Sequence, residues 1–115
     1  MRPYSEPPRE RLPKKKLSRA RQYLAELRGG PLSFGQMIES LREADGVSQA
    51  DLARKLKVSR AQLCDIEKGR RTVVPKRAAE FATILGYYVD QFVAVALEDQ
   101  LRTAGIPRKV TLDAA

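Results

Sequence analysis

The segment VSQADLARKLKVSRAQLCDIEKGRR, residues 47–71, decides how this chain of 115 residues folds. It contains two short runs whose apolar residues recur with helical spacing, and each run begins at a serine, Ser48 or Ser59. A serine in that place can accept a hydrogen bond from a free backbone N–H of the first helical turn. Leu52 and Leu63 follow the two serines as inward-facing residues. The pattern predicts two short helices separated by about three residues.

Three more helical patterns flank this segment and make the chain all-α. Ser33 begins a helix that ends before Gly46, and its serine again suits a helix start. Pro75 suits the first turn of another helix, which ends at Gly86. Residues 89–103 carry a long apolar stripe at helical spacing. We therefore predict five core helices.

Residues 1–30 differ in character from the rest of the chain. Residues 1–16 contain four prolines and almost no apolar residues, so we predict a flexible basic arm. Residues 17–28 carry an apolar stripe and predict a short additional helix. In the C-terminal tail, polar and apolar residues alternate in the sequence RKVTLD, so a short strand there is one alternative. We expect three divisions of the chain: the arm and short helix at residues 1–30, a helical domain at 31–104 and a tail at 105–115. The two short helices lie within the domain at about 48–68.

The positive charge is confined to two parts of the chain. Its net charge is +8, yet residues 1–30 alone carry +6 and residues 54–77 carry +7, so the remainder is acidic. A single charged run usually indicates no more than a solvated surface. Two separate basic clusters on an otherwise acidic chain instead indicate a surface that binds a polyanion.

Several functional classes are disfavoured by what the sequence lacks. With no histidine and a single cysteine, Cys64, it argues against a zinc site, a disulfide and a catalytic triad. It has no phosphate-binding glycine loop. The longest wholly apolar run, FVAVAL at 92–97, is too short to cross a membrane, and no signal-peptide pattern is visible. We therefore expect a cytoplasmic protein that is not an enzyme and uses no cofactor or metal.

Two short helices joined by a tight turn predict a helix-turn-helix, whose second helix presents its N-terminal residues to base edges in the major groove of DNA. The sequence SQADLARKLKVSRAQLCDIEKGRR resembles the Cro/C1-type (Xre) helix-turn-helix family of bacterial and phage repressors. The resemblance implies a λ-repressor-like five-helix DNA-binding domain, to which this chain adds the N-terminal helix and the basic arm. The likeness spans residues 33–93 and includes Gln49, Leu52-Ala53, Val58-Ser59, and Ile66-Glu67 followed by Gly69.

Two positions depart from the family pattern. Lys57 stands where the family usually has a glycine in the turn, so a lysine is expected to hold a left-handed backbone conformation there. Tyr88 stands where a small polar residue usually caps the fifth helix. The start of that helix is therefore left open by the resemblance.

The resemblance also implies roles for the helix that begins at Ser59. Arg60 can donate two hydrogen bonds to guanine, and Ala61 can contact a thymine methyl group. Gln62 has two alternatives, which are to read adenine or to cap the backbone N–H of Ser59. Asp65 could accept from N4 of cytosine, but nearby phosphates would repel it, so it is expected instead to orient Arg60 or to select against bases.

Further residues are expected to position the domain on DNA rather than to read its sequence. The resemblance pairs Glu67 with Arg42 on the first helix of the domain. The remaining expected contacts lie with the DNA backbone, and they are Gln49, Ser59, Lys68, Arg70, Arg71 and Lys76.

By resemblance, the chain is a dimeric, sequence-specific repressor of a double-stranded DNA operator, often its own promoter. The stripe in residues 89–103 fits a dimer interface, and the alternative is that the helix in 17–28 covers it within one chain. A second functional alternative is an antitoxin that also neutralises a protein toxin through residues 1–30. A general nucleic-acid condenser is disfavoured, because the chain outside its basic clusters is acidic. The expected dimer interface consists of Val89, Phe92, Val93, Ala96, Leu97 and Leu101.

Overall fold

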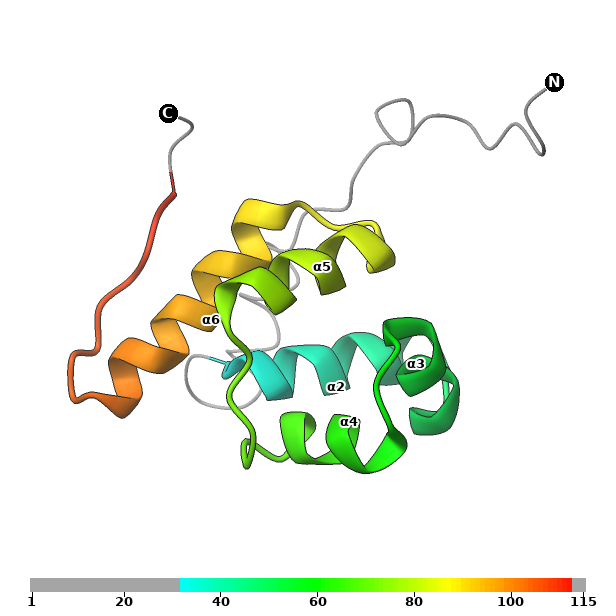
Figure 1. The fold of residues 1–115 in the computed structure, drawn as a ribbon. Helices are drawn as coiled ribbons and strands as arrows, with labels where there is room; N and C mark the ends of the chain where they lie inside the picture. The colour runs from blue at the N-terminus through cyan, green and yellow to red at the C-terminus, as the bar shows by residue number, and fades with distance from the viewer. Residues whose placement is uncertain (1–31, 113–115) are drawn as a thin grey trace, which may run out of the picture.

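The computed structural model describes residues 32–112, which fold into five helices and no strand (Figure 1). This confirms the predicted all-α class and five-helix core. The arm, the helix expected in residues 17–28 and the toxin-binding role attached to them lie outside the described residues. The helices are α2 (Phe34–Ala44), α3 (Gln49–Leu56), α4 (Arg60–Glu67), α5 (Pro75–Leu85) and α6 (Val89–Thr103).

The helix starts follow the capping residues of the sequence. Ser33 Oγ accepts a hydrogen bond from the backbone N–H of Gln36 at 3.0 Å, while Gln36 Oε1 accepts one from the backbone N–H of Ser33 at 3.0 Å. Ser48 Oγ accepts from the backbone N–H of Asp51 at 3.0 Å. Pro75 opens α5, where its missing N–H leaves no donor unpaired. These local contacts confirm the predicted starts.

The turn between α3 and α4 depends on an unusual backbone conformation at Lys57. Its φ of 62° and ψ of 41° are left-handed, as the departure from the family pattern predicts. This conformation costs a residue with a side chain roughly 1–2 kcal/mol. It lets the backbone N–H of Lys57 donate to the carbonyl oxygens of Ala53 and Arg54, which ends α3. At the other departure, Tyr88 makes no side-chain cap, and α6 begins at Val89.

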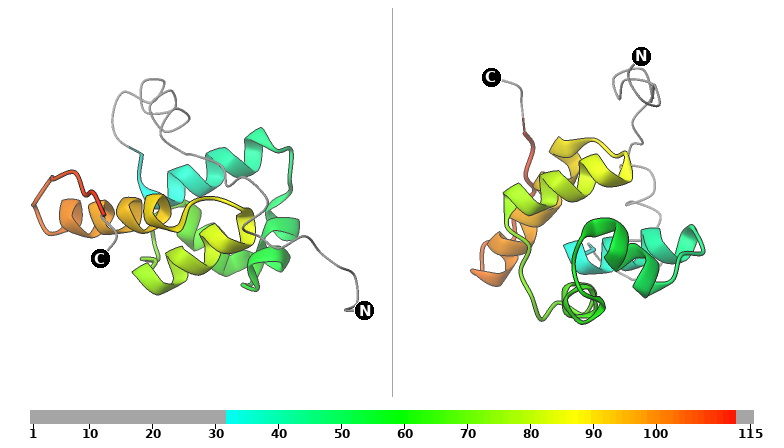
Figure 2. Two further views of the ribbon diagram at one scale, coloured as in Figure 1. Left: turned by 90° about the horizontal axis from the view of Figure 1, so that it is seen from above. Right: turned by 45° about the vertical axis from the view of Figure 1, so that its right-hand side comes forward.

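The helices form two groups that meet at a cluster of aromatic rings. In Figure 1, α5 and α6 lie above α2, α3 and α4, and the right-hand view of Figure 2 shows the same separation. The ring of Phe34 on α2 lies 5.8 Å from that of Phe92 on α6, at an interplanar angle of 87°. It also lies 6.4 Å from the ring of Phe81 on α5. Such tilted aromatic pairs add to the stabilisation from apolar burial and tie the groups together.

The apolar stripe of α6 is partly a core element of the single chain, which corrects the expected dimer interface. Phe92 is 0% exposed and Ala96 is 1% exposed, and both belong to the core. They cannot contribute to a subunit interface because their side chains already face α2 and α5. The other four residues of the expected set, Val89, Val93, Leu97 and Leu101, are half-buried.

The C-terminal tail packs on α6 without forming a strand. Residues 108–112 have no strand structure, so the sequence alternation is not a strand signal here. The backbone N–H of Val110 instead donates to Oε2 of Glu98, a buried acid on α6, at 2.9 Å. A side-chain carboxylate thus binds the tail at this point, whereas a strand would pair its backbone N–H and C=O groups with those of a neighbouring strand.

Gly35 sits where α2 and α4 approach most closely. A Cβ atom on residue 35 would lie 2.0 Å from the carbonyl oxygen of Ile66 and 2.9 Å from that of Glu67. No atom pair tolerates such a contact, so one of the two helices would have to move. A glycine at this position therefore fixes the distance between α2 and the end of α4.

We expect Gly35→Ala to lower the free energy of unfolding by about 1–3 kcal/mol, because the added methyl group overpacks the helix contact. Helix propensity alone predicts the opposite sign, since alanine is favoured over glycine in a helix by about 1 kcal/mol. Urea denaturation would measure the sign. The control is Gly46→Asn, which places a side chain in open space at a left-handed position that asparagine tolerates. A Gly35→Ala variant as stable as the wild type would contradict the packing argument.

Candidate nucleic-acid interface

The first turn of α4 presents an exposed face made of three successive side chains. Leu63 and Ile66 point into the core and are 0% and 4% exposed. Arg60, Ala61 and Gln62 are exposed on the other side of the helix. All three belong to the first turn of α4, before Leu63, its first inward-facing residue.

Arg60 is the least constrained cation of this face. Within residues 32–112 its guanidinium has no hydrogen bond and no ion pair, and it stands at the first position of α4. The neighbouring Ala61 is small, so it leaves room beside the guanidinium. All donors of Arg60 are therefore available to a partner outside the chain.

Gln62 caps the helix, and this narrows what it can read. Its Oε1 accepts from the backbone N–H of Ser59 at 2.9 Å, and Ser59 Oγ accepts from the backbone N–H of Gln62 at 2.9 Å. Reading adenine with two hydrogen bonds requires both the oxygen and the nitrogen of the amide. The capping alternative is therefore the one formed, and it leaves the Nε2 donors and the hydroxyl hydrogen of Ser59 free to face a ligand.

Asp65 pairs with a residue of the loop after α4, which corrects the expected contact with Arg60. Oδ1 of Asp65 accepts from Nε of Arg70 at 2.9 Å. This hydrogen bond raises the pKa of Arg70. Arg60 and Asp65 lie five residues apart, which is about 140° around a helix of 3.6 residues per turn, so they do not share a face. The sequence gives no direct signal for the actual pair, because Gly69 reverses the chain between its members.

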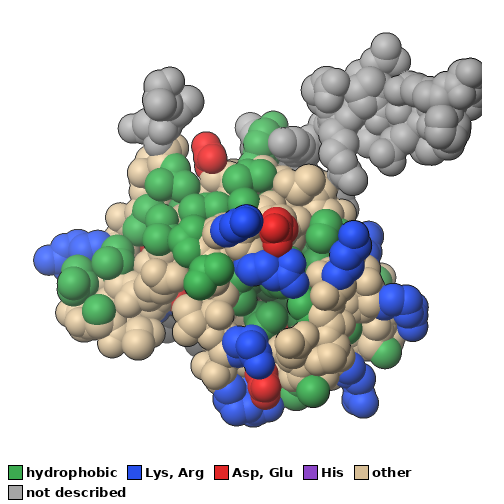
Figure 3. All heavy atoms as spheres, viewed as in Figure 1, with side chains coloured by type: hydrophobic (Ala, Val, Ile, Leu, Met, Phe, Trp, Pro, Cys, Tyr) green, Lys and Arg blue, Asp and Glu red, His purple; other side chains and the backbone are tan. Residues whose placement is uncertain are grey.

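The cations expected to meet phosphates surround α4. Lys68 is 54% exposed, with its Nζ 3.7 Å from Glu39 Oε2, a weak surface pair that a phosphate can replace. Arg71 and Lys76 are exposed, and the side chain of neither has a hydrogen bond or ion pair within residues 32–112. Figure 3 shows basic side chains over the lower and right-hand parts of this view, around α3, α4 and the start of α5. The structure thus brings the predicted cations to one side of the domain.

A hollow of about 290 Å³ lies between the first turn of α4, the α4–α5 loop and the start of α5. Lys57, Arg71 and Arg77 line it, and the ring of Phe81 forms part of its floor. The guanidinium carbon of Arg77 lies 4.9 Å from the centre of this ring, and its Nη1 donates to Oε1 of Glu80 at 2.7 Å. Lys57 has no place among the expected site residues. Its position in the basic segment 54–77 is the one signal that indicates it.

A buried carboxylate holds the helices of the interface together. The side chain of Glu67 is 0% exposed and accepts from Nε and Nη2 of Arg42 at 2.8 and 3.2 Å. This hydrogen bonding raises the pKa of Arg42, whose Nη1 also donates to the carbonyl oxygen of Val47 at 3.1 Å. The predicted pair is confirmed. Nε2 of Gln49 donates to Oε1 of Glu67 at 2.9 Å. This hydrogen bond anchors the glutamine that is expected to contact DNA to the buried carboxylate.

Residues 33–91, just over half of the chain, match the model of a family described as a helix-turn-helix domain. The chain belongs to this helix-turn-helix domain family. The motif consists of α3, the turn at residues 57–59 and α4, so the chain is a DNA-binding helix-turn-helix protein. No curated protein and no solved structure matches the chain.

The chemistry that this helix-turn-helix offers is hydrogen-bond donation and positive charge. Among residues 32–112, no three His, Cys, Asp or Glu side chains gather closely enough to hold a metal ion. In the same part of the chain, no helix combines the length and the apolar character that crossing a membrane requires. Exposed guanidinium, amide and hydroxyl donors around one short helix suit base edges and phosphates.

The Arg42–Glu67 pair is expected to show a large coupling energy in a double-mutant cycle with alanine at both positions. Removing one partner leaves the other charge buried and unpaired, which costs about 3–5 kcal/mol. Urea denaturation of the four proteins would measure the coupling. The matched control is the Asp51–Arg54 pair, whose side chains are 59% and 74% exposed and which should couple by about 0–1 kcal/mol. Additive losses at Arg42 and Glu67 would show that the buried pair does not stabilise the motif.

Proposed function

We propose that this chain is a sequence-specific transcriptional regulator that binds a double-stranded DNA operator and acts by binding rather than by catalysis. The observation that carries this proposal is the exposed first turn of α4, whose Arg60 has no partner within residues 32–112. In a helix-turn-helix, the N-terminal residues of the second helix enter the major groove. A regulator of this kind acts in the cytoplasm.

Base reading rests on the two exposed residues that cap no backbone group. Arg60 can donate to both O6 and N7 of guanine, which discriminates against other bases by about 1–3 kcal/mol. Ala61 can pack against a thymine methyl group. Gln62, held in the capping box, contributes only the donors of its Nε2 and no acceptor, and therefore a weaker preference.

The phosphate contacts are proposed on both sides of this reading turn. Gln49 keeps the second N–H of its Nε2 free at the start of α3, beside the one that donates to Glu67. Ser59 keeps its hydroxyl hydrogen free at the start of α4, although its Oγ accepts from the backbone N–H of Gln62. Arg71 and Lys76 supply charge from the loop and from α5. Contacts of this type fix the register of the domain on DNA and give its binding a strong dependence on salt.

Arg60→Ala should relax the preference at one position of the half-site, because it removes a base contact. Arg71→Ala should weaken binding to all sequences alike and reduce the salt slope by about one unit, because it removes a phosphate contact. Titrations of both variants against half-site variants at several salt concentrations would separate the two effects. An Arg60→Ala protein with an unchanged order of preference among half-sites would show that another residue reads the sequence.

We further propose that the regulator is a dimeric repressor that pairs through α6. Val89, Val93, Leu97 and Leu101 remain only half-buried after the core has taken Phe92 and Ala96. Figure 3 shows apolar side chains gathered over α5 and α6, away from the basic side chains around α4. Helix-turn-helix proteins bind two half-sites about 34–36 Å apart by pairing through a two-fold axis. A dimer on a promoter would exclude the polymerase, which makes repression the expected outcome.

Light scattering at micromolar concentration should give about twice the chain mass of 12.9 kDa for the wild type, as a two-fold pair requires. Leu97→Asp should reduce the mass to that of the monomer, because it places a charge in the paired surface. Thr103→Asp, which adds the same charge at an exposed position of α6, should leave the mass unchanged. A wild-type protein that is monomeric both free and on DNA would remove this part of the proposal.

A further inference from the structure

We propose that Asp65 and Arg70 act as one base-reading unit, in which Asp65 orients Arg70 so that its guanidinium reads a guanine in the major groove. This inference rests on the proposed DNA-binding function. It adds to Arg60 a second, independent specificity determinant, which comes from the loop after α4 rather than from the first turn of the helix.

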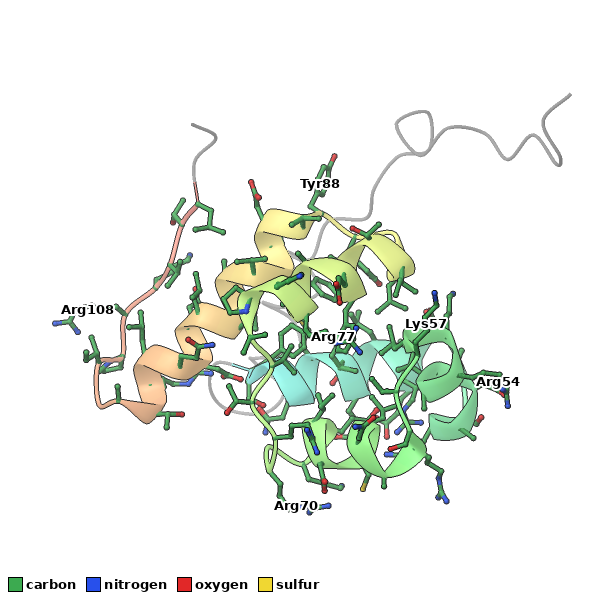
Figure 4. The ribbon with its side chains drawn as sticks, in the orientation of Figure 1. Arg54, Lys57, Arg70, Arg77, Tyr88 and Arg108 are labelled. Atoms are coloured by element: carbon green, nitrogen blue, oxygen red, sulfur yellow. The ribbon has the colours of Figure 1, made fainter. Side chains whose placement is uncertain are left out.

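The guanidinium of Arg70 is held at two points on the exposed side of α4. Its Nε donates to Oδ1 of Asp65 at 2.9 Å, and its Nη2 lies 3.6 Å from Sγ of Cys64. The backbone N–H groups of Arg70 and Arg71 donate to the carbonyl oxygen of Asp65 at 2.8 and 3.2 Å. Figure 4 shows Arg70 beneath α4, at the bottom of the view. The backbone at Arg70 and the side chain of Arg70 thus both fold back against α4.

The position of Asp65 indicates that its pair with Arg70 is more than an incidental surface ion pair. Asp65 stands in the middle of the helix that enters the major groove, where a bare carboxylate would meet phosphates of the same charge. Its side chain is 38% exposed and that of Arg70 is 60% exposed, so the pair faces outward together. Arg70 cancels the charge of Asp65 and places donors on a surface that would otherwise repel DNA.

The remaining donors of Arg70 form a fork that fits the two acceptors of guanine as it fits the oxygens of a phosphate. The edge of the guanidinium that contains Nε and one N–H of Nη2 is turned toward Asp65 and Cys64. The opposite edge, formed by Nη1 and the other N–H of Nη2, points away from these partners. Two parallel N–H groups of this kind fit the O6 and N7 acceptors of guanine. A lysine has the same charge but cannot present such a fork.

A phosphate contact predicts a different pattern, which makes the two roles separable. If Arg70 binds only phosphate, its charge is what counts, and removing the acidic Asp65 should strengthen binding to every sequence alike. If Arg70 reads a base, removing Asp65 should still strengthen non-specific binding. It should at the same time reduce the preference for guanine, because the guanidinium loses its orientation.

The experiment begins with selection of wild-type binding sites from a random double-stranded DNA library. The enriched site and its single-position variants are then titrated with Arg70→Lys, Asp65→Ala and Asp65→Asn. We expect Arg70→Lys to keep the salt dependence and to lose about tenfold of the preference for guanine at one position. Asp65→Ala should lose part of the same preference while binding non-specific DNA more tightly.

Circular dichroism of each variant checks folding. Asp65→Asn keeps the shape of the side chain and one acceptor, so it should retain more of the preference for guanine than Asp65→Ala.

The matched control is Asp51→Ala, which breaks an exposed aspartate–arginine pair of the same 2.9 Å length on α3. It removes the same charge as Asp65→Ala and should leave every base preference intact. If Arg70→Lys keeps the full preference for guanine while Arg60→Ala loses its own, Arg70 is a phosphate contact and the inference is overturned, but the proposed function stands. If Arg70→Lys loses the preference and Asp65→Ala retains it, the orienting role of Asp65 is wrong. A wild-type protein that enriches no sequence overturns both the inference and the proposed function.

Discussion

The carboxylate of Glu67 is the group on which the arrangement of the helix-turn-helix depends. It ends α4, lies out of contact with solvent, and accepts hydrogen bonds from Arg42 on α2 and from Gln49 at the start of α3. A buried carboxylate is strongly disfavoured unless such partners surround it. The three helices must therefore meet at this point for the chain to fold. The orientation of α4 relative to α3 thus follows from a charge that never reaches the DNA surface.

The packing of α4 against α2 supplies the distance that the hydrogen bonds leave undefined. Gly35 lets the last carbonyl groups of α4 approach the backbone of α2 more closely than any side chain would allow. The other end of the motif is held by the left-handed turn at Lys57, which ends α3 and aims the chain toward Ser59. A reading helix needs such rigid support, because base edges discriminate only when the donors are held in place. The scaffold and the reading surface are consequently made by different residues of the same short helix.

Charge on the outer surface is organised by pairing. A basic partner holds each of five acids, either in the buried network or in a surface ion pair: Glu39, Asp51, Asp65, Glu67 and Glu80. Within residues 32–112, no acidic partner pairs with the side chains of three cations: Arg60, Arg71 and Lys76. The basic segment therefore presents uncompensated charge at particular places rather than as a uniform field. That distribution favours a register on DNA, which a merely basic surface does not provide.

The five helices and their starting residues could be predicted from local sequence signals. Those features are local, because a serine cap, its partner three residues later and the next apolar residues lie within one or two turns. The left-handed Lys57 and the Arg42–Glu67 pair were also predictable, but only through likeness to a family whose motif carries them. The two alternatives for Gln62 stayed open at the level of sequence, and the hydrogen bond that its Oε1 accepts from Ser59 decided between them.

The partners of the remaining polar groups and the burial of the apolar residues depend on long-range packing. Asp65 binds Arg70 because the chain reverses at Gly69, and no helical spacing reveals that return. Phe92 and Ala96 lie in the core because α6 crosses both α2 and α5, whereas their period along the helix is equally that of an interface. The need for glycine at position 35 arises from the backbone of Ile66 and Glu67 at the end of α4. In each case the deciding contact joins segments whose separation is fixed by packing, and packing is a property of the whole fold rather than of any stretch of sequence.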